Sequence, residues 1–240
     1  MLYNEVIKIW RDVEKNDLLK KFFPQFVYES NKIENNETRF KDVESIFKEE
    51  EVKDFKGNKN TLKEIENQRK LCNNIVELTK ENNTKLSIEL IKHFHCVLMK
   101  ECFTEKLIVN GEKPGEFKKG DYVVGIHNIG CSPDEVQENL QSLIDEVNEV
   151  QITDKNVLKV VSYFHCWFET IHPFADGNGR VGRMLINYLI IGNNLPPIII
   201  SKNDSEEYYL ALEYFNLNQE IDKMVKFLDE QAYKTWINFL

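Results

Sequence analysis

The stretch HPFADGNGRVGR, from His172 to Arg183, brings a histidine, a carboxylate, glycines and two arginines into one short segment. The glycines can turn consecutive backbone N–H groups toward one point, and the N-terminus of a following helix adds positive potential. Arg180 and Arg183 are three positions apart, so they share a helix face and can grip phosphate oxygens through paired hydrogen bonds. The segment therefore predicts an anion site suited to phosphate.

Two further side chains of this segment extend the prediction from binding to chemistry. Asp176 would lie beside the cationic site, where a carboxylate is best explained as a ligand of a phosphate-bound Mg²⁺. His172 can take a proton from an attacking hydroxyl, because the unperturbed pKa of imidazole lies near neutral pH. An interhelical turn would explain any one of these residues, but it gives no reason to combine them. The set predicts transfer at phosphorus with Mg²⁺ and a polyphosphate bound together.

The segment resembles the signature of the Fic family, HxFx(D/E)GN(G/K)RxxR, whose members mostly transfer AMP from ATP to a hydroxyl side chain of a target protein. The resemblance implies that His172 is the general base, Asp176 the Mg²⁺ ligand and Arg183 the clamp on the γ-phosphate. A glycine at 179 favours nucleotidyl transfer, because the kinase-like branch of the family has lysine there. The resemblance also implies an anion hole for the α- and β-phosphates, formed by Gly177, Asn178, Gly179 and Arg180.

Two other segments resemble parts of the same family that contact the nucleotide. PGEFKKGDYVVG is similar to the stretch that leads into the family's flap, a hairpin that pairs with the backbone of the target. Lys118 departs from the arginine common there, which leaves a local salt bridge open. YYLALEYFN is similar to the segment that borders the adenine, although core packing would also explain its tyrosines. The implied nucleotide contacts are Tyr122, Val123, Val124 and Gly125 in the flap, and Tyr208, Tyr209, Leu212 and Asn216 beside the adenine.

An N-terminal segment, FVYESNKIENNE, suggests a regulatory contact. Ser30 and Glu34 are four apart on one face of an expected short helix. Asn31 and Glu34 also have capping-box spacing, which would instead make Glu34 a solvent-facing helix start, and the residues alone do not decide. SNKIEN resembles the family's inhibitory motif (S/T)xxxE(G/N), which implies an inhibitory helix around residues 25–36 of the same chain. Glu34 would then pair with Arg183 and withhold it from the γ-phosphate.

Helices dominate the elements that must position these residues. An apolar stripe predicts a helix at the N-terminus, and Pro24 is expected to end it or restart the chain before the short helix that follows. Thr61 with Glu64 has capping-box spacing, Ser87 can cap the next helix, and Ser132 begins a capping box with a proline at the first helical position. The range 156–171 is apolar on nearly all sides, as a central buried helix requires. The range 181–191 predicts the helix that follows the motif.

The predicted fold is a compact all-α Fic-type domain over residues 1–240, with one small β-hairpin. Its strand centre is Tyr122 to Val124. The formal net charge of −9 argues against nucleic acid as a partner. No apolar run is long enough for a membrane span or signal peptide, so a cytoplasmic location is expected. Five cysteines without a CxxC pair favour reduced thiols.

The function that these observations favour is protein adenylyl transfer from ATP to a Ser, Thr or Tyr hydroxyl of a target protein, and to the chain itself. Two alternatives stay open: removal of AMP from a modified target, and a non-catalytic module that senses ATP. A zinc site is disfavoured because His93 and His95 point to different faces of a helix, and His95 and His165 are better explained as core histidines. The target protein and a homo-oligomeric state are left open by the sequence.

Overall fold

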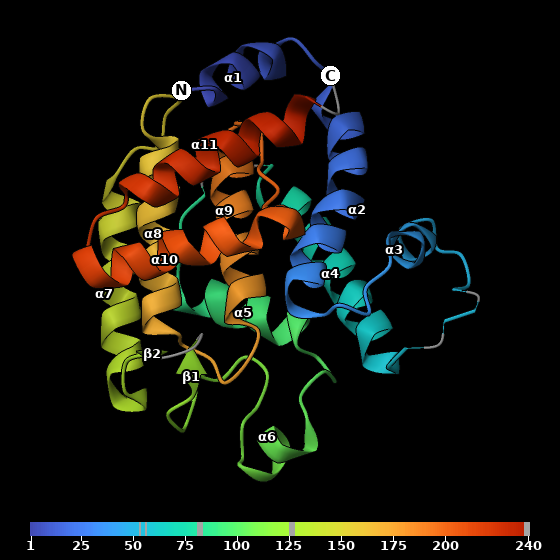
Figure 1. Ribbon diagram of the computed structural model, residues 1–240, viewed down its shortest axis with the longest axis vertical. Coiled ribbons are helices and arrows are strands. Elements are labelled where there is room, and N and C mark those ends of the chain that lie inside the picture. Colours follow the sequence, from blue (N-terminus) through green and yellow to red (C-terminus); the bar gives the residue numbers. More distant parts are fainter. Residues whose placement is uncertain (53, 56, 81–83, 125–127, 238–240) are drawn as a thin grey trace.

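The computed structural model describes residues 1–52, 54–55, 57–80, 84–124 and 128–237, and for 123–124 and 128–129 it describes the backbone. Over these ranges the chain is almost entirely helical (Figure 1). The helices are α1 (Tyr3–Arg11), α2 (Lys15–Glu34), α3 (Phe40–Phe47), α4 (Lys59–Leu78), α5 (Ile88–Leu98), α6 (Glu105–Val109), α7 (Val136–Glu149), α8 (Val157–Ile171), α9 (Asn178–Gly192), α10 (Ser205–Asn218) and α11 (Asp222–Ile237).

Helix α9 lies at the centre of the domain, where it packs against α8, α5 and α2 (Figure 1). Its residues are buried on nearly all sides, because apolar side chains occupy every face of the helix and no charged stripe turns toward water. Helix α8 is apolar in the same way and precedes α9 by only a short loop. The predicted motif is therefore the connection between the two most buried helices of this domain.

The first and last helices of the described chain lie together on one side of the domain, where α1 packs against α11 (Figure 1). The rings of Trp10 and Trp236 pack edge to face with 5.1 Å between centroids. Phe22 of α2 stacks on Trp236 from another side, at 6.1 Å. Burial of these large rings stabilises the position of α2, because aromatic pairs contribute about 0.5–1.5 kcal/mol beyond the area they bury.

Helix α2 corrects the expectation that Pro24 would end a helix or restart the chain. The structure has one continuous helix from Lys15 to Glu34 with Pro24 inside it. A proline in a helix interior costs a backbone hydrogen bond, but tertiary packing can outweigh that cost. Here Phe22, Phe23 and Phe26 around the proline are all buried. Glu34 consequently lies at the C-terminal end of a long helix, so the alternative of a helix start at this position is wrong.

The predicted helix starts are confirmed in two cases and wrong in one. Ser87 accepts a hydrogen bond from the backbone N–H of Leu90, and Ser132 forms its capping box. The capping box of Thr61 and Glu64 is absent, because α4 begins earlier, with Asn58 as the cap. Asn58 accepts from the N–H of Asn60 and leaves the other two side chains free for tertiary contacts.

At the predicted hairpin the structure describes only a minimal ladder, and a flap beside the active site stays a prediction. Strand β1 (Val123–Val124) pairs antiparallel with strand β2 (Asn128–Ile129), with two residues on each side. Gly125, which the family resemblance placed in the flap, lies outside the described residues. The all-α assignment is confirmed. Among the described helices, none has both the length and the apolarity needed to cross a membrane.

Candidate active site

The motif loop, residues 172–177, is shaped by its own backbone and by one asparagine. His172 ends α8 in a left-handed conformation, with φ 51° and ψ 64°. Asn178, the first residue of α9, is buried and bridges back across the loop to the backbone of Phe174. Its amide donates to the carbonyl of Phe174 at 2.8 Å, and its oxygen accepts from the N–H of the same residue at 2.9 Å. The two bonds fix the loop, because both partners are buried and neither can turn to water.

His95 supports the loop from α5. The backbone N–H of Gly115 donates to Nδ1 of His95 at 2.8 Å, so the ring proton resides on Nε2, which donates to the carbonyl of Asp176 at 3.0 Å. The ring also stacks on Phe174 with 3.8 Å between centroids. Burial lowers the pKa of His95 to about 3. His95 is a satisfied core histidine, as predicted.

The imidazole of His172 is held in its neutral form. Burial lowers its pKa to about 4, and the ammonium group of Lys118 acts in the same direction. Lys118 is itself buried; its backbone N–H donates to the carbonyl of Pro173 at 2.9 Å and its Nζ to that of Ile171 at 3.5 Å. The thiol of Cys131 also donates to the carbonyl of Ile171. Residues on both sides of the hairpin are thus tied to the peptide groups that flank His172.

Arg183 contacts both residues predicted for the lock. Its Nε donates to the hydroxyl of Ser30 at 3.0 Å, and its Nη2 donates to Oε1 of Glu34 at 2.7 Å and to the backbone carbonyl of Ser30 at 3.0 Å. Burial opposes the charged form of each partner. Their mutual attraction outweighs that cost, so the pKa of Glu34 is lowered and that of Arg183 is raised. The predicted contact between Glu34 and Arg183 is confirmed.

The carboxylate of Glu34 lies over the N-terminus of α9. A Cβ atom added at Gly179 would meet Oε1 of Glu34 at 2.7 Å and Nη1 of Arg183 at 2.9 Å. The first turn of a helix is a favourable place for an anion, because its free N–H groups and its dipole point there. Glu34 therefore occupies the place that the sequence assigned to a phosphate, and Gly179 leaves the room for it.

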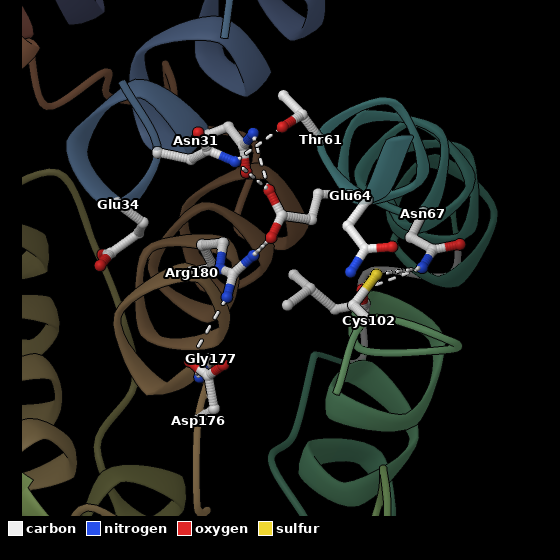
Figure 2. Close-up of polar contacts among 12 residues, drawn as sticks. Asn31, Glu34, Thr61, Glu64, Asn67, Cys102, Asp176, Gly177 and Arg180 are labelled. Carbon is white, nitrogen blue, oxygen red and sulfur yellow. Dashed lines mark hydrogen bonds and ion pairs between the residues drawn. The ribbon is translucent and has the colours of Figure 1, made fainter. Parts of the chain in front are cut away.

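Arg180 pairs with carboxylates from two directions (Figure 2). Its Nη1 lies 3.2 Å from Oε1 of Glu64 on α4, and its Nη2 lies 3.5 Å from Oδ1 of Asp176 in the motif loop. Burial works against the charged guanidinium, but Glu64, Asp176 and Glu34 outweigh it and raise its pKa. The guanidinium is therefore always charged, and its orientation depends on α4.

The described residues fit a bound polyphosphate. Within these ranges, Nε of Arg180 and Nη1 of Arg183 are buried donors without a hydrogen-bond partner. A buried donor without a partner is costly unless a ligand accepts its hydrogen bond. These two donors therefore mark where phosphate oxygens can bind. No group of three or more His, Cys, Asp or Glu side chains among the described residues forms a preformed metal cage. The half-exposed carboxylate of Asp176 fits Mg²⁺, which is commonly held by one carboxylate together with substrate phosphates.

Comparison with known proteins identifies a family for the segment that contains the motif. Residues 85–190 match the Fic/DOC family. These residues belong to a Fic domain. The protein adenylyltransferase Fic of Drosophila willistoni is 31% identical over 121 residues, which is 50% of this chain and 24% of that protein. The protein adenylyltransferase fic-1 of Caenorhabditis elegans is 33% identical over 86 residues, which is 36% of this chain and 17% of that protein. This chain therefore spans only a small part of the curated relatives that it matches.

The fold of the whole chain is that of solved Fic proteins. A Fic domain containing signaling protein from Bacteroides thetaiotaomicron has a TM-score of 0.81 at 19% identity, covering 99% of this chain and 94% of that one. Fic-1 from C. elegans has a TM-score of 0.79 at 18% identity, covering 99% of this chain and 70% of that one. The likeness includes the N-terminal helices, which lie outside the matched range 85–190.

The candidate adenine segment, residues 208–216, contains both buried and exposed residues. Tyr208 is buried, and its hydroxyl lies 2.7 Å from Nε2 of His165, so core packing accounts for its contacts. Tyr209 is 47% exposed and faces outward. Asn216 accepts a hydrogen bond from the hydroxyl of Thr170, near the end of α8, and Leu212 is half-buried. A role in nucleotide contact stays a prediction for Tyr209, Leu212 and Asn216. The ring of Tyr208 instead packs near Arg183, with 6.0 Å between the guanidinium carbon and the ring centroid.

The segment leading into the hairpin is anchored by one buried carboxylate. Glu112 accepts from the hydroxyl of Tyr122 at 2.7 Å and from the backbone N–H of Lys119 at 2.9 Å. Tyr122 is thus half-buried and bonded within its own segment. For Val123 and Val124 the structure gives the ladder only, and their role toward a nucleotide stays a prediction.

Two acidic residues of the site were not singled out as functional by the sequence. Glu64 was interpreted as part of a helix cap, whereas it pairs with Arg180. Glu169, one turn before His172, lies inside the site, and burial raises the pKa of its carboxyl group to about 7. Its only signal in the sequence is a lone acid within the apolar range 156–171.

Proposed function

We propose that this Fic domain transfers AMP from ATP to a hydroxyl side chain of a target protein and to itself, and that Glu34 holds it inactive. The observation that carries the proposal is the position of the Glu34 carboxylate on Arg183 and over Gly179. The carboxylate lies where the free N–H groups of the helix N-terminus would hold an anion, so it competes directly with a phosphate.

In the proposed reaction, the oxygen of the target hydroxyl attacks the α-phosphorus of ATP and the bond to the bridging oxygen of pyrophosphate breaks. His172 accepts the hydroxyl proton, for which its neutral form is required. The N-terminus of α9, Arg180 and Arg183 orient the phosphates and oppose their charge. Mg²⁺, held by Asp176 and the phosphates, would neutralise charge on the leaving pyrophosphate.

The pKa of His172 gives this proposal a pH signature. Because that pKa is lowered to about 4, the imidazole is already neutral well below physiological pH. The rate should therefore show no loss from protonation of the base between about pH 5 and 8, unlike a site whose histidine keeps the ordinary pKa of about 6.5. The rate is measured in the Glu34→Gly variant, and a loss of half the rate near pH 6.5 in several different buffers would contradict this assignment.

The decisive experiment is mass spectrometry of the purified chain after incubation with ATP and Mg²⁺. The Glu34→Gly variant should gain AMP on its own hydroxyl side chains, and the wild type should gain much less. Glu34→Gly combined with His172→Ala should gain none. Equal modification of wild type and Glu34→Gly would overturn the lock, and unchanged modification without His172 would overturn the mechanism. Absence of AMP from every variant would favour the ATP-sensing alternative.

A further inference from the structure

Glu64 joins three parts of the site that are far apart in the sequence (Figure 2). One oxygen of its carboxylate, Oε1, pairs with Nη1 of Arg180 at 3.2 Å. The other oxygen, Oε2, accepts hydrogen bonds from the side-chain amides of Asn35 at 3.0 Å and Asn31 at 3.3 Å. These asparagines belong to the α2 end, residues 30–35, which also carries Glu34. A single carboxylate therefore links the α2 end to the first arginine of the motif.

The surroundings make this link a built feature of the domain. The side chains of Arg180 and Glu64 are only 5% and 14% exposed, so each charge depends on the other. Asn31 is fully buried, and its amide oxygen accepts from Gln68, one turn after Glu64 on α4. Both oxygens of the Glu64 carboxylate are paired or hydrogen-bonded, as burial of a polar group requires.

We propose that Glu64 is a positioning residue that fastens the α2 end to Arg180, so that the helix carrying Glu34 is tied to both arginines of the motif. Glu34 holds Arg183 directly, and Asn31 and Asn35 hold Arg180 through Glu64. The assignment of Arg180 to a phosphate rests on the proposed function, whereas the tie between the α2 end and Glu64 does not.

The proposal separates two kinds of release. Loss of the Glu34 side chain removes the carboxylate from Arg183 but leaves the α2 end docked through Glu64 and through the bonds of Ser30 to Arg183. Loss of the tie at Glu64 loosens the α2 end and also removes the partner that orients Arg180. A regulator that only displaces Glu34 and one that undocks the helix would therefore act on different contacts.

Reversal of hydrogen-bond polarity tests the tie without any need for catalysis. Asn35→Asp places a carboxylate against that of Glu64, and we expect backbone amide exchange over residues 31–36 to rise by about tenfold. Adding Glu64→Gln supplies an amide that donates to the new aspartate, so the double variant should return to within about threefold of the wild type. Asn36→Asp, the same change at an exposed neighbour, is the matched control and should leave exchange unchanged.

Hydrogen exchange of the full chain, measured by mass spectrometry, decides whether Glu64 holds the α2 end. No effect of Asn35→Asp, or a double variant that exchanges as fast as Asn35→Asp alone, would overturn the tie. Melting temperatures of all variants guard against global unfolding. Should Asn35→Asp fail to fold, recovery of a folded chain by adding Glu64→Gln supports the tie equally, and failure of both variants to fold counts against it.

Steady-state kinetics test the part that concerns Arg180. In the active Glu34→Gly background, Glu64→Gln should raise the KM for ATP by about tenfold and change kcat less, because Arg180 binds phosphate but loses its orientation. Glu66→Gln, the same substitution on the exposed face of α4, should change neither. An unchanged KM would overturn the positioning role of Glu64. Absence of AMP transfer in the background variant would instead count against the proposed function, and the exchange result would stand.

Discussion

Burial opposes charge both around the motif loop and at the α2 end, yet its outcome for the titratable groups differs between the two regions. Around the motif loop it favours neutral forms: the pKa of His95 falls to about 3, that of His172 to about 4, and that of Glu169 rises to about 7. At the α2 end the pKa of Glu34 is lowered and that of Arg183 is raised, so both remain charged.

The difference follows from the partners that each region has at hand. The hydrogen-bond partners of His95 and of the loop backbone at Phe174 are neutral groups, which cannot compensate a full charge. At the α2 end opposite charges lie in direct contact, and their attraction exceeds the cost of burial. Neutral hydrogen bonds make the motif loop a permanent structure, whereas charged contacts at the α2 end can be exchanged for those of another anion.

The largest expected effect is a loss of stability when the hydrogen bonds of the motif loop are removed. Asn178→Ala removes two buried hydrogen bonds and leaves the N–H and the carbonyl of Phe174 without partners. We expect a loss of about 3 kcal/mol in the free energy of unfolding, measured by urea denaturation. Asn218→Ala removes the bond of an exposed asparagine to the carbonyl four residues before it, and serves as the control. Similar losses in both variants would contradict a special role for the loop bonds.

A second prediction uses the raised pKa of Glu169. The native state binds a proton between the ordinary pKa of this carboxyl, near 4.5, and about 7, where the unfolded chain does not, so its contribution to stability is present at low pH and lost as pH rises. Glu169→Gln should therefore stabilise the domain at pH 8 by about 2 kcal/mol and have little effect at pH 4.5. Thermal unfolding at the two pH values measures the difference. An equal effect at both would show that the carboxyl is charged in the native state.

The affinity for nucleotide tests whether a phosphate can replace Glu34 on Arg183. In a His172→Ala background, which prevents turnover, Glu34→Gln should tighten binding of Mg-ATP by about tenfold, because the nucleotide no longer displaces a carboxylate from Arg183. Isothermal titration calorimetry measures the affinity, with Glu138→Gln on α7 as an exposed control. Unchanged affinity would mean that Glu34 and the phosphates do not share Arg183.

The smallest expected effect concerns Lys118. Its ammonium group contributes to the lowered pKa of His172, after burial. Lys118→Met keeps the apolar stem and removes the charge, so the pKa of His172 should rise, as followed by NMR titration of its ring. Lys119→Met changes an exposed neighbour and should leave that titration unmoved. If the pKa of His172 fell in Lys118→Met, the Lys118 charge would not be a cause of its lowered value.

Local patterns carried most of what the sequence could predict. The caps at Ser87 and Ser132, the buried helix before the motif and the order of groups in HPFADGNGRVGR depend on residues a few positions apart. The contact of Glu34 with Arg183 joins distant helices, and only the family resemblance pointed to it. The predicted helix break at Pro24 was wrong because the packing of the neighbouring phenylalanines outweighed the tendency of proline to end a helix. Glu64 was misinterpreted because its spacing to Thr61 matches a cap, while its real partners lie on two other helices.

The close contact at Gly179 predicts which substitutions can occur together in the evolution of proteins with this fold. A side chain at this position would require the carboxylate of Glu34 to move, since even a Cβ atom would approach its Oε1 to 2.7 Å. The two positions are therefore not free to diverge independently. In an alignment of homologues, residues larger than glycine at 179 should be concentrated in lineages that have lost the acid at 34, and the order of the two changes on a phylogenetic tree should place loss of the acid first.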